Sequence, residues 1–309
     1  MGDISNRLGR TRSEEGDHWV FRFANGLVVH TEPFMKPDRQ RILPLGGPQD
    51  TILNRLVCVS ETVKGRRVFE PFAGSGILGL MALRLGAGHV DFLDINPRAC
   101  EFQRDNAWRN GFAADRFVAH LGSIEDFEPE APFDLVLANP PFVPTPPGVE
   151  GTLTSAAGAD GNELVDVLLQ RMGTLLEPDG EAFIYTMQLL ANGTPLLAPR
   201  LQELLDGRTT HLTPAQAEPM PFDDYYEAYR RSFPAHHDAI EAWRGELEQA
   251  HGDNLALQHY VMHVSARRDG PALWTITDDL KAKYGMLPYP AGANRELALA
   301  RVMENVVLG

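Results

Sequence analysis

Cysteine is scarce in this chain of 309 residues, which contains only Cys58 and Cys100. Two cysteines cannot build a disulfide scaffold or a cysteine-rich zinc site, so both classes are excluded. The adjacent His236 and His237 point in different directions from a helix and make a poor metal site. We therefore predict no bound metal and a reducing, cytoplasmic location.

Long apolar runs are also missing. The longest stretches, such as Ile77–Leu83, fall far short of the ~20 residues that a membrane span requires. The first residues are polar and charged and lack the apolar segment of a secretory signal. N-terminal myristoylation favours Ser or Thr at position 6, where this chain has Asn6. We expect no association with a membrane.

Positive charge is in short supply, because 28 Lys and Arg stand against 42 Asp and Glu, for a formal net charge of −14. Proteins that bind long nucleic acids usually present a basic face that neutralises phosphates. The balance argues against a nucleic-acid partner and favours a small molecule, a peptide or a protein. The assembly state stays open, a homodimer included.

The hydrophobic pattern divides the chain into four segments. Residues 1–50 form a β-rich lead-in, where WVFRFANGLVVH predicts a two-stranded ribbon around Asn25 and Gly26. Residues 51–189 alternate strands and helices and form the core. Residues 190–250 are predicted to be a mostly helical insertion or lid. Residues 251–309 complete the core with LALQHYVMHVSA as an exposed or edge strand, LWTIT as a short strand, and a closing helix.

The core segment predicts a doubly wound α/β fold. Its expected strands are Arg67–Phe69, HVDFLDI, RFVAHLG, FDLVLA and EAFIYTM. Its expected helices are Gln49–Val63, ILGLMALRLG, PRACEFQRDNAWRNG and ELVDVLLQRMGTLL. Such alternation favours a mostly parallel sheet covered by helices on both faces.

A glycine-bearing turn follows the first of these strands and opens a helix. The turn consists of Phe72, Ala73, Gly74, Ser75 and Gly76. Glycines there let a ligand approach the backbone closely, and the helix N-terminus offers free N–H groups. Glu70 precedes the turn, and a carboxylate there repels a pyrophosphate but suits an ammonium group. This favours a ligand with an amino acid moiety over NAD, with simple turn chemistry as the alternative.

Asp94 ends the next strand, 18 residues after Gly76. An acid at this position can accept hydrogen bonds from both hydroxyls of a ribose. The same side chain also fits an N-cap for the helix that begins at Pro97, and both roles can hold together.

The fourth strand ends in Asn139, Pro140, Pro141 and Phe142. Consecutive prolines stiffen the chain and leave the Asn139 side-chain oxygen and the Pro140 carbonyl as fixed acceptors at the sheet edge. Two acceptors aimed at one NH2 group would hold its lone pair toward an electrophile, and Phe142 could stack on a planar group. We predict a catalytic role for these four residues, with a rigid proline-rich loop as the alternative.

Taken together, EPFAGSG, LDIN, FDLVLANPPF and AGADGNELVDVLLQR resemble the class I S-adenosylmethionine-dependent methyltransferases. Over about residues 65–190 the chain is similar to the NPPY-type N-methyltransferases that include the release-factor glutamine methyltransferases. The resemblance implies a seven-stranded Rossmann-like sheet, with S-adenosylmethionine as cofactor and S-adenosylhomocysteine as product. It implies that Glu70 meets the methionine amino group, Asp94 the ribose, and Ser123 with Ile124 the adenine. Further cofactor contacts are expected from Phe72, Ala73, Gly74, Ser75, Gly76, Ile95 and Asn139.

The chain departs from that family at three places. Phe142 stands where the family usually has Tyr, and Ser123 where it often has an acid, for which Glu125 or Asp126 could substitute. About 65 residues precede the first motif, and they do not have the pattern of the helical domain found in the release-factor enzymes.

The insertion is rich in aromatic residues. We predict that its Tyr225, Tyr226, Tyr229 and Arg230 bind substrate, with packing on the core as the alternative. The predicted reaction is methyl transfer to an amide, amine or amino-heterocycle nitrogen of a small molecule or peptide. A protein glutamine methyltransferase, an adenine methyltransferase acting on RNA or DNA, and a non-catalytic partner subunit remain alternatives.

Overall fold

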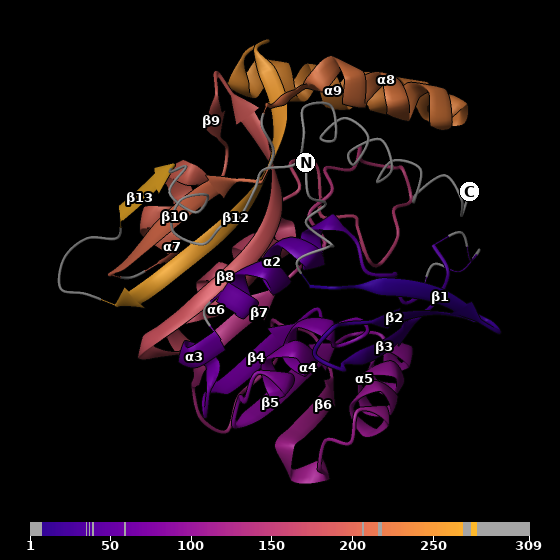
Figure 1. The fold of residues 1–309 in the computed structure, drawn as a ribbon. Coiled ribbons are helices and arrows are strands. Elements are labelled where there is room, and N and C mark those ends of the chain that lie inside the picture. Colours follow the sequence, from indigo (N-terminus) through magenta and orange to yellow (C-terminus); the bar gives the residue numbers. More distant parts are fainter. Residues whose placement is uncertain are drawn as a thin grey trace.

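The computed structural model describes residues 8–276, apart from residues 35, 37, 39, 59, 206, 216–217 and 268–272. These residues form a three-stranded N-terminal sheet and a ten-stranded central sheet (Figure 1). Within these described ranges, no helix is long and apolar enough to cross a membrane.

The N-terminal sheet is an antiparallel ribbon in the order β1 (Thr11–Glu15), β2 (His18–Arg22) and β3 (Val28–Thr31). Gly26 lies in the turn between β2 and β3 with a φ of +82°, a conformation that glycine adopts without strain. The predicted two-stranded ribbon is confirmed, and β1 adds a third strand that the sequence pattern did not indicate.

Two asparagines tie the ribbon to α5 (Pro97–Arg109). Asn106 accepts from the His30 N–H at 2.9 Å and donates to the His30 carbonyl at 3.1 Å. Asn110, at the C-terminal cap of α5, makes the same pair of bonds with Val28, at 2.8 and 2.6 Å. Four helical residues rise ~6 Å and two strand residues ~6.6 Å, so the two amide groups match alternate residues of β3.

The central sheet has the strand order β13-β10-β12-β8-β7-β4-β5-β6, with β9 beside β8 and β11 beside β12. The strands are β4 (Arg67–Pro71), β5 (His89–Asp94), β6 (Phe117–Leu121), β7 (Phe133–Ala138), β8 (Leu176–Ala191), β9 (Thr194–Pro195), β10 (Arg208–Pro214), β11 (Met220–Pro221), β12 (Leu255–Arg267) and β13 (Leu273–Ile276). Strands β4 to β8 are parallel to their neighbours in this group, whereas β12 is antiparallel to both β8 and β10. The expected mostly parallel sheet is confirmed, and β9, β11 and β13 extend it beyond the seven strands expected.

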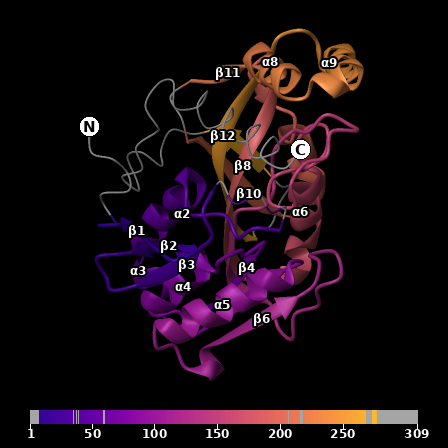
Figure 2. The same ribbon diagram turned by 90° about the vertical axis from the view of Figure 1, so that its right-hand side faces the viewer.

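Helices cover both faces of this sheet (Figure 2). One face packs against α2 (Gly47–Cys58), α4 (Ile77–Arg84) and α5, and the other against α6 (Glu163–Leu175) and α7 (Leu201–Leu204). Shorter helical segments are α3 (Ser60–Val63), η1 (Ala114–Arg116), η2 (Ala198–Arg200) and η3 (Pro234–His236). The doubly wound arrangement is therefore confirmed.

The segment 190–250 is less helical than expected. Strand β10 lies within it and pairs with β12, so this part of the segment belongs to the sheet. Its long helices are α8 (Phe222–Ser232) and α9 (His237–His251), which form a hairpin at one end of the molecule (Figure 1). The boundaries of the four expected segments otherwise stay predictions.

The expected edge position of β12 is wrong, because β8 and β10 flank it on either side. Its Gln258 and His259 are buried despite their polarity. The LWTIT segment does form a strand, β13, whereas the closing helix expected over residues 293–307 lies outside the described residues.

Strand β8 is much longer than the strand predicted from EAFIYTM. Ala138, the last residue of β7, pairs with Ile184, so β8 continues for seven residues past the end of its neighbour. This projecting part pairs with β12 and β9 and rises beside the carboxyl edge of the sheet, where Asn139 follows β7.

Candidate functional site

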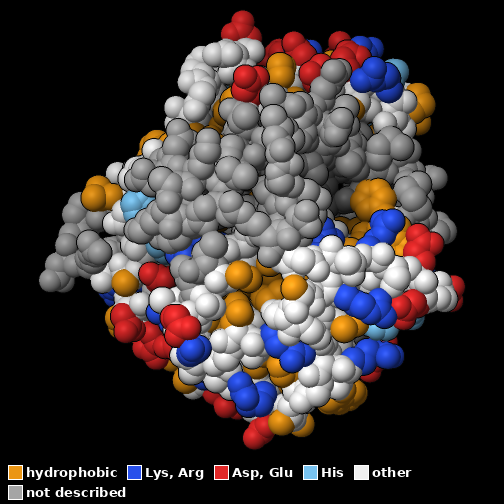
Figure 3. All heavy atoms as spheres, in the orientation of Figure 1, with side chains coloured by type: hydrophobic (Ala, Val, Ile, Leu, Met, Phe, Trp, Pro, Cys, Tyr) orange, Lys and Arg blue, Asp and Glu red, His pale blue; other side chains and the backbone are white. Residues whose placement is uncertain are grey.

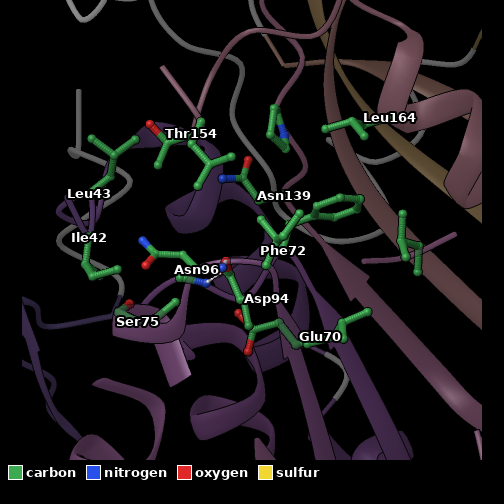
Figure 4. A pocket seen from close by; sticks show the side chains of 18 of the residues that line it. Ile42, Leu43, Glu70, Phe72, Ser75, Asp94, Asn96, Asn139, Thr154 and Leu164 are labelled. Atoms are coloured by element: carbon green, nitrogen blue, oxygen red, sulfur yellow. Dashed lines mark hydrogen bonds between the residues drawn. The ribbon is translucent and has the colours of Figure 1, made fainter. Parts of the chain in front are cut away.

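A cavity of about 250 Å³ opens at the carboxyl ends of β4, β5 and β7 (Figure 4). Most residues predicted from the sequence to bind cofactor or catalyse line it. They are Glu70, Phe72, Ala73, Gly74, Ser75, Asp94, Ile95, Ser123, Ile124, Asn139 and Pro141. Of the remaining predicted residues of these two groups, Gly76, Pro140 and Phe142 do not line it. Residues far apart in sequence thus meet because parallel strands end at one edge of the sheet.

The glycine turn leaves open space beside its backbone. Gly74 has a φ of +50°, and a Cβ built there would meet no atom within 4 Å outside its immediate chain neighbours. Gly76 has a φ of +78° and packs closely against Phe92, since a Cβ there would lie 3.1 Å from the Phe92 ring. The two glycines therefore have different roles. Gly74 faces the cavity, and Gly76 allows the turn to pack closely against β5.

Phe72 has an unusual backbone conformation for an aromatic residue. Its φ is +56°, in the left-handed region that side chains with a Cβ rarely adopt. The ring is half-buried against the core and also lines the cavity. In Figure 4 Phe72 and Asn139 both point into the same space. Backbone strain of this kind costs about 1–3 kcal/mol and tends to occur at functional sites.

Glu70 joins the end of β4 to the start of α4. Its two carboxylate oxygens accept hydrogen bonds from the backbone N–H groups of Leu78, at 3.1 Å, and Gly79, at 2.7 Å. The side chain is only 2% exposed, and burial raises the pKa of Glu70 to about 8 although the two N–H donors act in the opposite direction. A cation placed beside it in the cavity would favour its ionised form.

Asp94 fixes the opposite side of the glycine turn. It accepts hydrogen bonds from the N–H of Gly74, at 2.8 Å, and of Asn96, at 2.9 Å. Burial raises the pKa of Asp94 above its ordinary value, although the backbone hydrogen bonds act in the opposite direction. The Ile95 N–H also bonds this carboxylate, and three donors leave acceptor capacity on it for a ligand hydroxyl. The N-cap side chain of α5 is Asn96, which accepts from the Arg98 N–H at 3.0 Å, so Asp94 does not hold the capping role considered above.

Asn139 presents an unsatisfied oxygen. Among the described residues, its buried Oδ1 atom has no hydrogen-bond partner. Buried acceptors are rarely left without a donor, so this atom is suited to an N–H or NH2 group of a ligand. Pro141 stands next to it in the wall of the cavity.

Phe142 is not placed as the stacking surface expected for it. The side chain is 3% exposed, and its ring packs 5.6 Å from Tyr185 and 5.8 Å from His259, measured between ring centroids. Phe72 is the aromatic residue that lines the cavity instead.

Ser123 and Ile124 follow β6 in the chain and line the cavity. Ser123 donates to Asp126 at 3.3 Å, and Ile124 is buried. Ile95 also lines the cavity with 57% of its surface exposed, which provides an apolar surface for a flat ligand group.

The sequence did not indicate the segment 40–43, which precedes α2 and supplies Ile42 and Leu43 to the cavity wall (Figure 4). Asn96 holds this segment by donating to the Gln40 carbonyl at 2.7 Å. Arg98 adds ion pairs with Glu32 and Asp38. The sequence of these residues has no periodic pattern that would indicate a site. Only the turn Leu-Pro-Leu-Gly-Gly-Pro at residues 43–48 indicates a fixed conformation.

Three of the four residues predicted to bind substrate are buried in the α8–α9 hairpin: Tyr225, Tyr226 and Tyr229. The hydroxyls of Tyr225 and Tyr229 both donate to the Pro144 carbonyl, at 2.9 and 3.2 Å. Arg230 pairs with Glu227 and lies over the Tyr226 ring. None of the four lines the cavity, so the structure supports packing for the tyrosines rather than contact with a substrate there.

The described residues contain no cluster of three or more His, Cys, Asp or Glu side chains that could hold a metal ion. The polar side chains that line the cavity include the carboxylates of Glu70 and Asp94, the Arg41 guanidinium and the Asn139 amide.

Comparison with known families matches residues 52–140 to the family described as ribosomal protein L11 methyltransferase (PrmA). The L11 methyltransferase of Marinobacter nauticus is 44% identical over 79 residues, which are 26% of this chain and 26% of that protein. That of Pelotomaculum thermopropionicum is 44% identical over 128 residues, 41% of this chain and 36% of that protein. The chain thus spans only about a quarter to a third of the length of these relatives.

Solved structures resemble the chain at low identity. The L11 methylase of Lactobacillus delbrueckii subsp. bulgaricus is 18% identical, with a TM-score of 0.40, and the match covers 73% of this chain and 82% of that chain. An S-adenosylmethionine-dependent methyltransferase of Agrobacterium tumefaciens is 12% identical, with a TM-score of 0.49 and coverage of 83% and 72%.

The segment matched in sequence contains Glu70, the glycine turn, Asp94 and Asn139, and ends just before Pro141. The family found is not the release-factor branch to which the motifs were compared. What the comparisons establish is that residues 52–140, which build most of the cavity, are similar to the corresponding part of the ribosomal protein L11 methyltransferases.

Proposed function

We propose that this chain is an S-adenosylmethionine-dependent methyltransferase that acts on a nitrogen atom of a protein. The observation that carries the proposal is the buried Oδ1 of Asn139, which has no hydrogen-bond partner in the described part of the chain, while Asn139 lines the same cavity as the glycine turn and Asp94. An acceptor for an N–H group and a site suited to a nucleoside with an amino acid moiety lie together there.

The residues present fit this cofactor. Asp94 lines the cavity with acceptor capacity left for a ribose hydroxyl, and the open space beside Gly74 admits a chain of atoms close to the backbone. Glu70 offers a buried carboxyl group for an ammonium group, and exposed Ile95 offers an apolar surface for the base. These assignments follow from donor and acceptor chemistry in the cavity.

When bound, S-adenosylmethionine supplies a methyl group that its sulfonium has already activated. The chain therefore needs to bind, orient and exclude water more than to move protons. Asn139 accepts an N–H bond from the incoming nitrogen, so that the remaining lone pair is held toward the cavity. Ile42 and Leu43 on one side and Thr154 on another line this space (Figure 4).

Among the acceptors that we expected from the sequence, a protein is favoured over a small molecule. The family matched over residues 52–140 is described by a protein substrate, ribosomal protein L11. The acceptor nitrogen, an amine or the glutamine amide suggested by the release-factor resemblance, is part of this proposal and open to test. The net charge of −14 and the acidic groups over α8 and α9 (Figure 3) argue against a polynucleotide.

The test is a methylation assay with defined acceptors. Wild-type protein and Asn139→Ala are incubated with S-adenosylmethionine and bacterial ribosomal protein L11, a lysine peptide or a glutamine peptide. Intact-mass and fragment spectra locate any added methyl group. We expect methylation of at least one protein or peptide nitrogen by the wild type and none by Asn139→Ala. Calorimetry with S-adenosylhomocysteine is run in parallel, and absence of both binding and methylation would contradict the proposal.

A further inference from the structure

The loop of residues 143–162 connects Phe142 to the start of α6 in sequence and forms part of the cavity wall. It folds back on itself, with a bridge between Val143 and Ala156 and a bond from the Thr145 N–H to the Gly158 carbonyl at 2.9 Å. From this loop, Leu153 and Thr154 line the cavity. In Figure 4 Thr154 lies across the cavity from Asp94 and Ser75.

The α8–α9 hairpin holds this loop at both of its ends. Tyr225 and Tyr229 donate from α8 to the Pro144 carbonyl, at 2.9 and 3.2 Å. Trp243 donates from α9 through Nε1 to the Ala159 carbonyl at 2.9 Å. Three side chains of the hairpin therefore bind two main-chain carbonyls that lie near the beginning and the end of the loop.

These three side chains are fixed by one another. Tyr225 and Tyr229 are fully buried and Trp243 is 1% exposed. The ring centroids of Tyr225 and Tyr229 lie 5.3 Å apart, and that of Trp243 lies 5.8 Å from Tyr229 and 5.1 Å from Phe222. Closely packed aromatic rings have little rotational freedom, so their hydrogen-bond donors are held in place.

We propose that the hairpin positions the methyl acceptor without contacting it, by fixing the loop 143–162 through Tyr225, Tyr229 and Trp243. The inference rests on the proposed function and adds a set of positioning residues to it. Because Leu153 and Thr154 face the cavity opposite the glycine turn, displacement of the loop moves the acceptor wall and leaves the cofactor side in place.

A purely structural role for the hairpin predicts a different result. Loss of its hydrogen bonds would then lower the stability of the whole protein and affect cofactor and acceptor alike. A positioning role predicts that the KM for the acceptor rises while the affinity for the cofactor product stays constant.

The test uses the double variant Tyr225→Phe/Tyr229→Phe in the full chain, which removes both donors to Pro144 and keeps the rings. The matched control is Tyr226→Phe, on the same helix, because Tyr226 makes neither of these bonds. Calorimetry with S-adenosylhomocysteine, hydrogen exchange of the loop peptides and steady-state kinetics with the acceptor methylated by the wild type are measured for each. Trp243→Phe replaces the double variant if the latter does not fold.

We expect hydrogen exchange in residues 143–162 to rise by about five- to tenfold in the double variant, from the loss of two hydrogen bonds. The acceptor KM should rise by a similar factor, with S-adenosylhomocysteine affinity within about twofold of wild type. Values for the double variant equal to those of Tyr226→Phe would overturn the positioning role. A wild-type protein that neither binds S-adenosylhomocysteine nor methylates a probe contradicts instead the proposed function on which the inference rests.

Discussion

Phe72 offers a direct test of whether the site stores backbone strain. The residue has a φ of +56° and a half-buried ring that lines the cavity. Replacement by Ala keeps the strained backbone and removes the ring, whereas replacement by Gly removes both. At ordinary positions Gly is less stable than Ala by roughly 0.5–1 kcal/mol because of its greater freedom in the unfolded chain. At Phe72 we expect the reverse order.

The magnitudes follow from the structure. Half-burial of a phenylalanine ring contributes about 1 kcal/mol, which both variants lose. The Ala variant retains a left-handed backbone with a Cβ, whereas Gly relieves strain of about 1–3 kcal/mol. After the entropic cost of Gly, Phe72→Gly should be more stable than Phe72→Ala by about 1 kcal/mol. For a chain of this size the difference corresponds to about 2 °C in Tm.

Urea unfolding followed by circular dichroism, together with thermal melts, measures this difference. Ala73→Gly is the matched control, since Ala73 is the next residue, is buried, and is not among the residues with positive φ. That control should lose roughly 0.5–1 kcal/mol of stability. If Phe72→Ala proves more stable than Phe72→Gly, the strained backbone does not exist in solution. Both Phe72 variants should also transfer methyl groups more slowly, because the aromatic wall of the cavity is gone.

Three further predictions concern the polar groups of the cavity. Asn139→Ala should lower the rate of methyl transfer by at least about 100-fold through lost orientation, with S-adenosylhomocysteine affinity near wild type by calorimetry; equal loss of both would make Asn139 structural. Asp94→Ala should weaken S-adenosylhomocysteine binding by about 1–3 kcal/mol, and Ser123→Ala, measured alongside, by much less; unchanged binding would exclude Asp94 from the cofactor site. Because burial raises the folded-state pKa of Glu70 to about 8, its contribution to stability is present at low pH and is lost as pH rises from the ordinary carboxyl range to about 8. Glu70→Gln should flatten this part of the profile in urea titrations, and an unchanged slope would count against the raised pKa.

Much of the site could be predicted because its residues follow strand ends. Glu70, Asp94 and Asn139 each lie at the carboxyl end of a parallel strand, or one residue from it, and the topology alone brings such positions together. Ile42 and Leu43 could not be found in this way. They come from an irregular segment whose position depends on bonds to Asn96 and Arg98, about 55 to 65 residues later in the chain.

Side-chain direction was the main source of error at the site. Phe142 and Phe72 are both aromatic residues next to strand ends, and only the packing of Phe142 on Tyr185 and His259 shows which of them faces the cavity. Aromatic residues such as Tyr225 and Tyr229 are typical both of a binding surface and of a core. Their packing against Trp243 shows that they belong to the core, and this packing depends on the tertiary fold.

The fold was predictable where local pattern and tertiary context agree. Helices α4, α5 and α6 and strands β5, β6 and β7 lie close to their expected ranges. Strand β10 was missed because RTTHLTP is polar and short, and its burial comes from its partners β12 and β13. The same pairing explains why β12 is interior although its alternating sequence is typical of an edge.

The pairing of α5 with β3 also bears on how the protein behaves at high concentration. β3 is the last strand of the N-terminal ribbon, and a free strand edge is a template for joining another chain and for aggregation. The side chains of Asn106 and Asn110 occupy the outward N–H and carbonyl groups of His30 and Val28 in the manner of a neighbouring strand. Two amide side chains of one helix thus close this edge to intermolecular β-sheet growth, and colloidal stability becomes a consequence of the same contacts that anchor the ribbon.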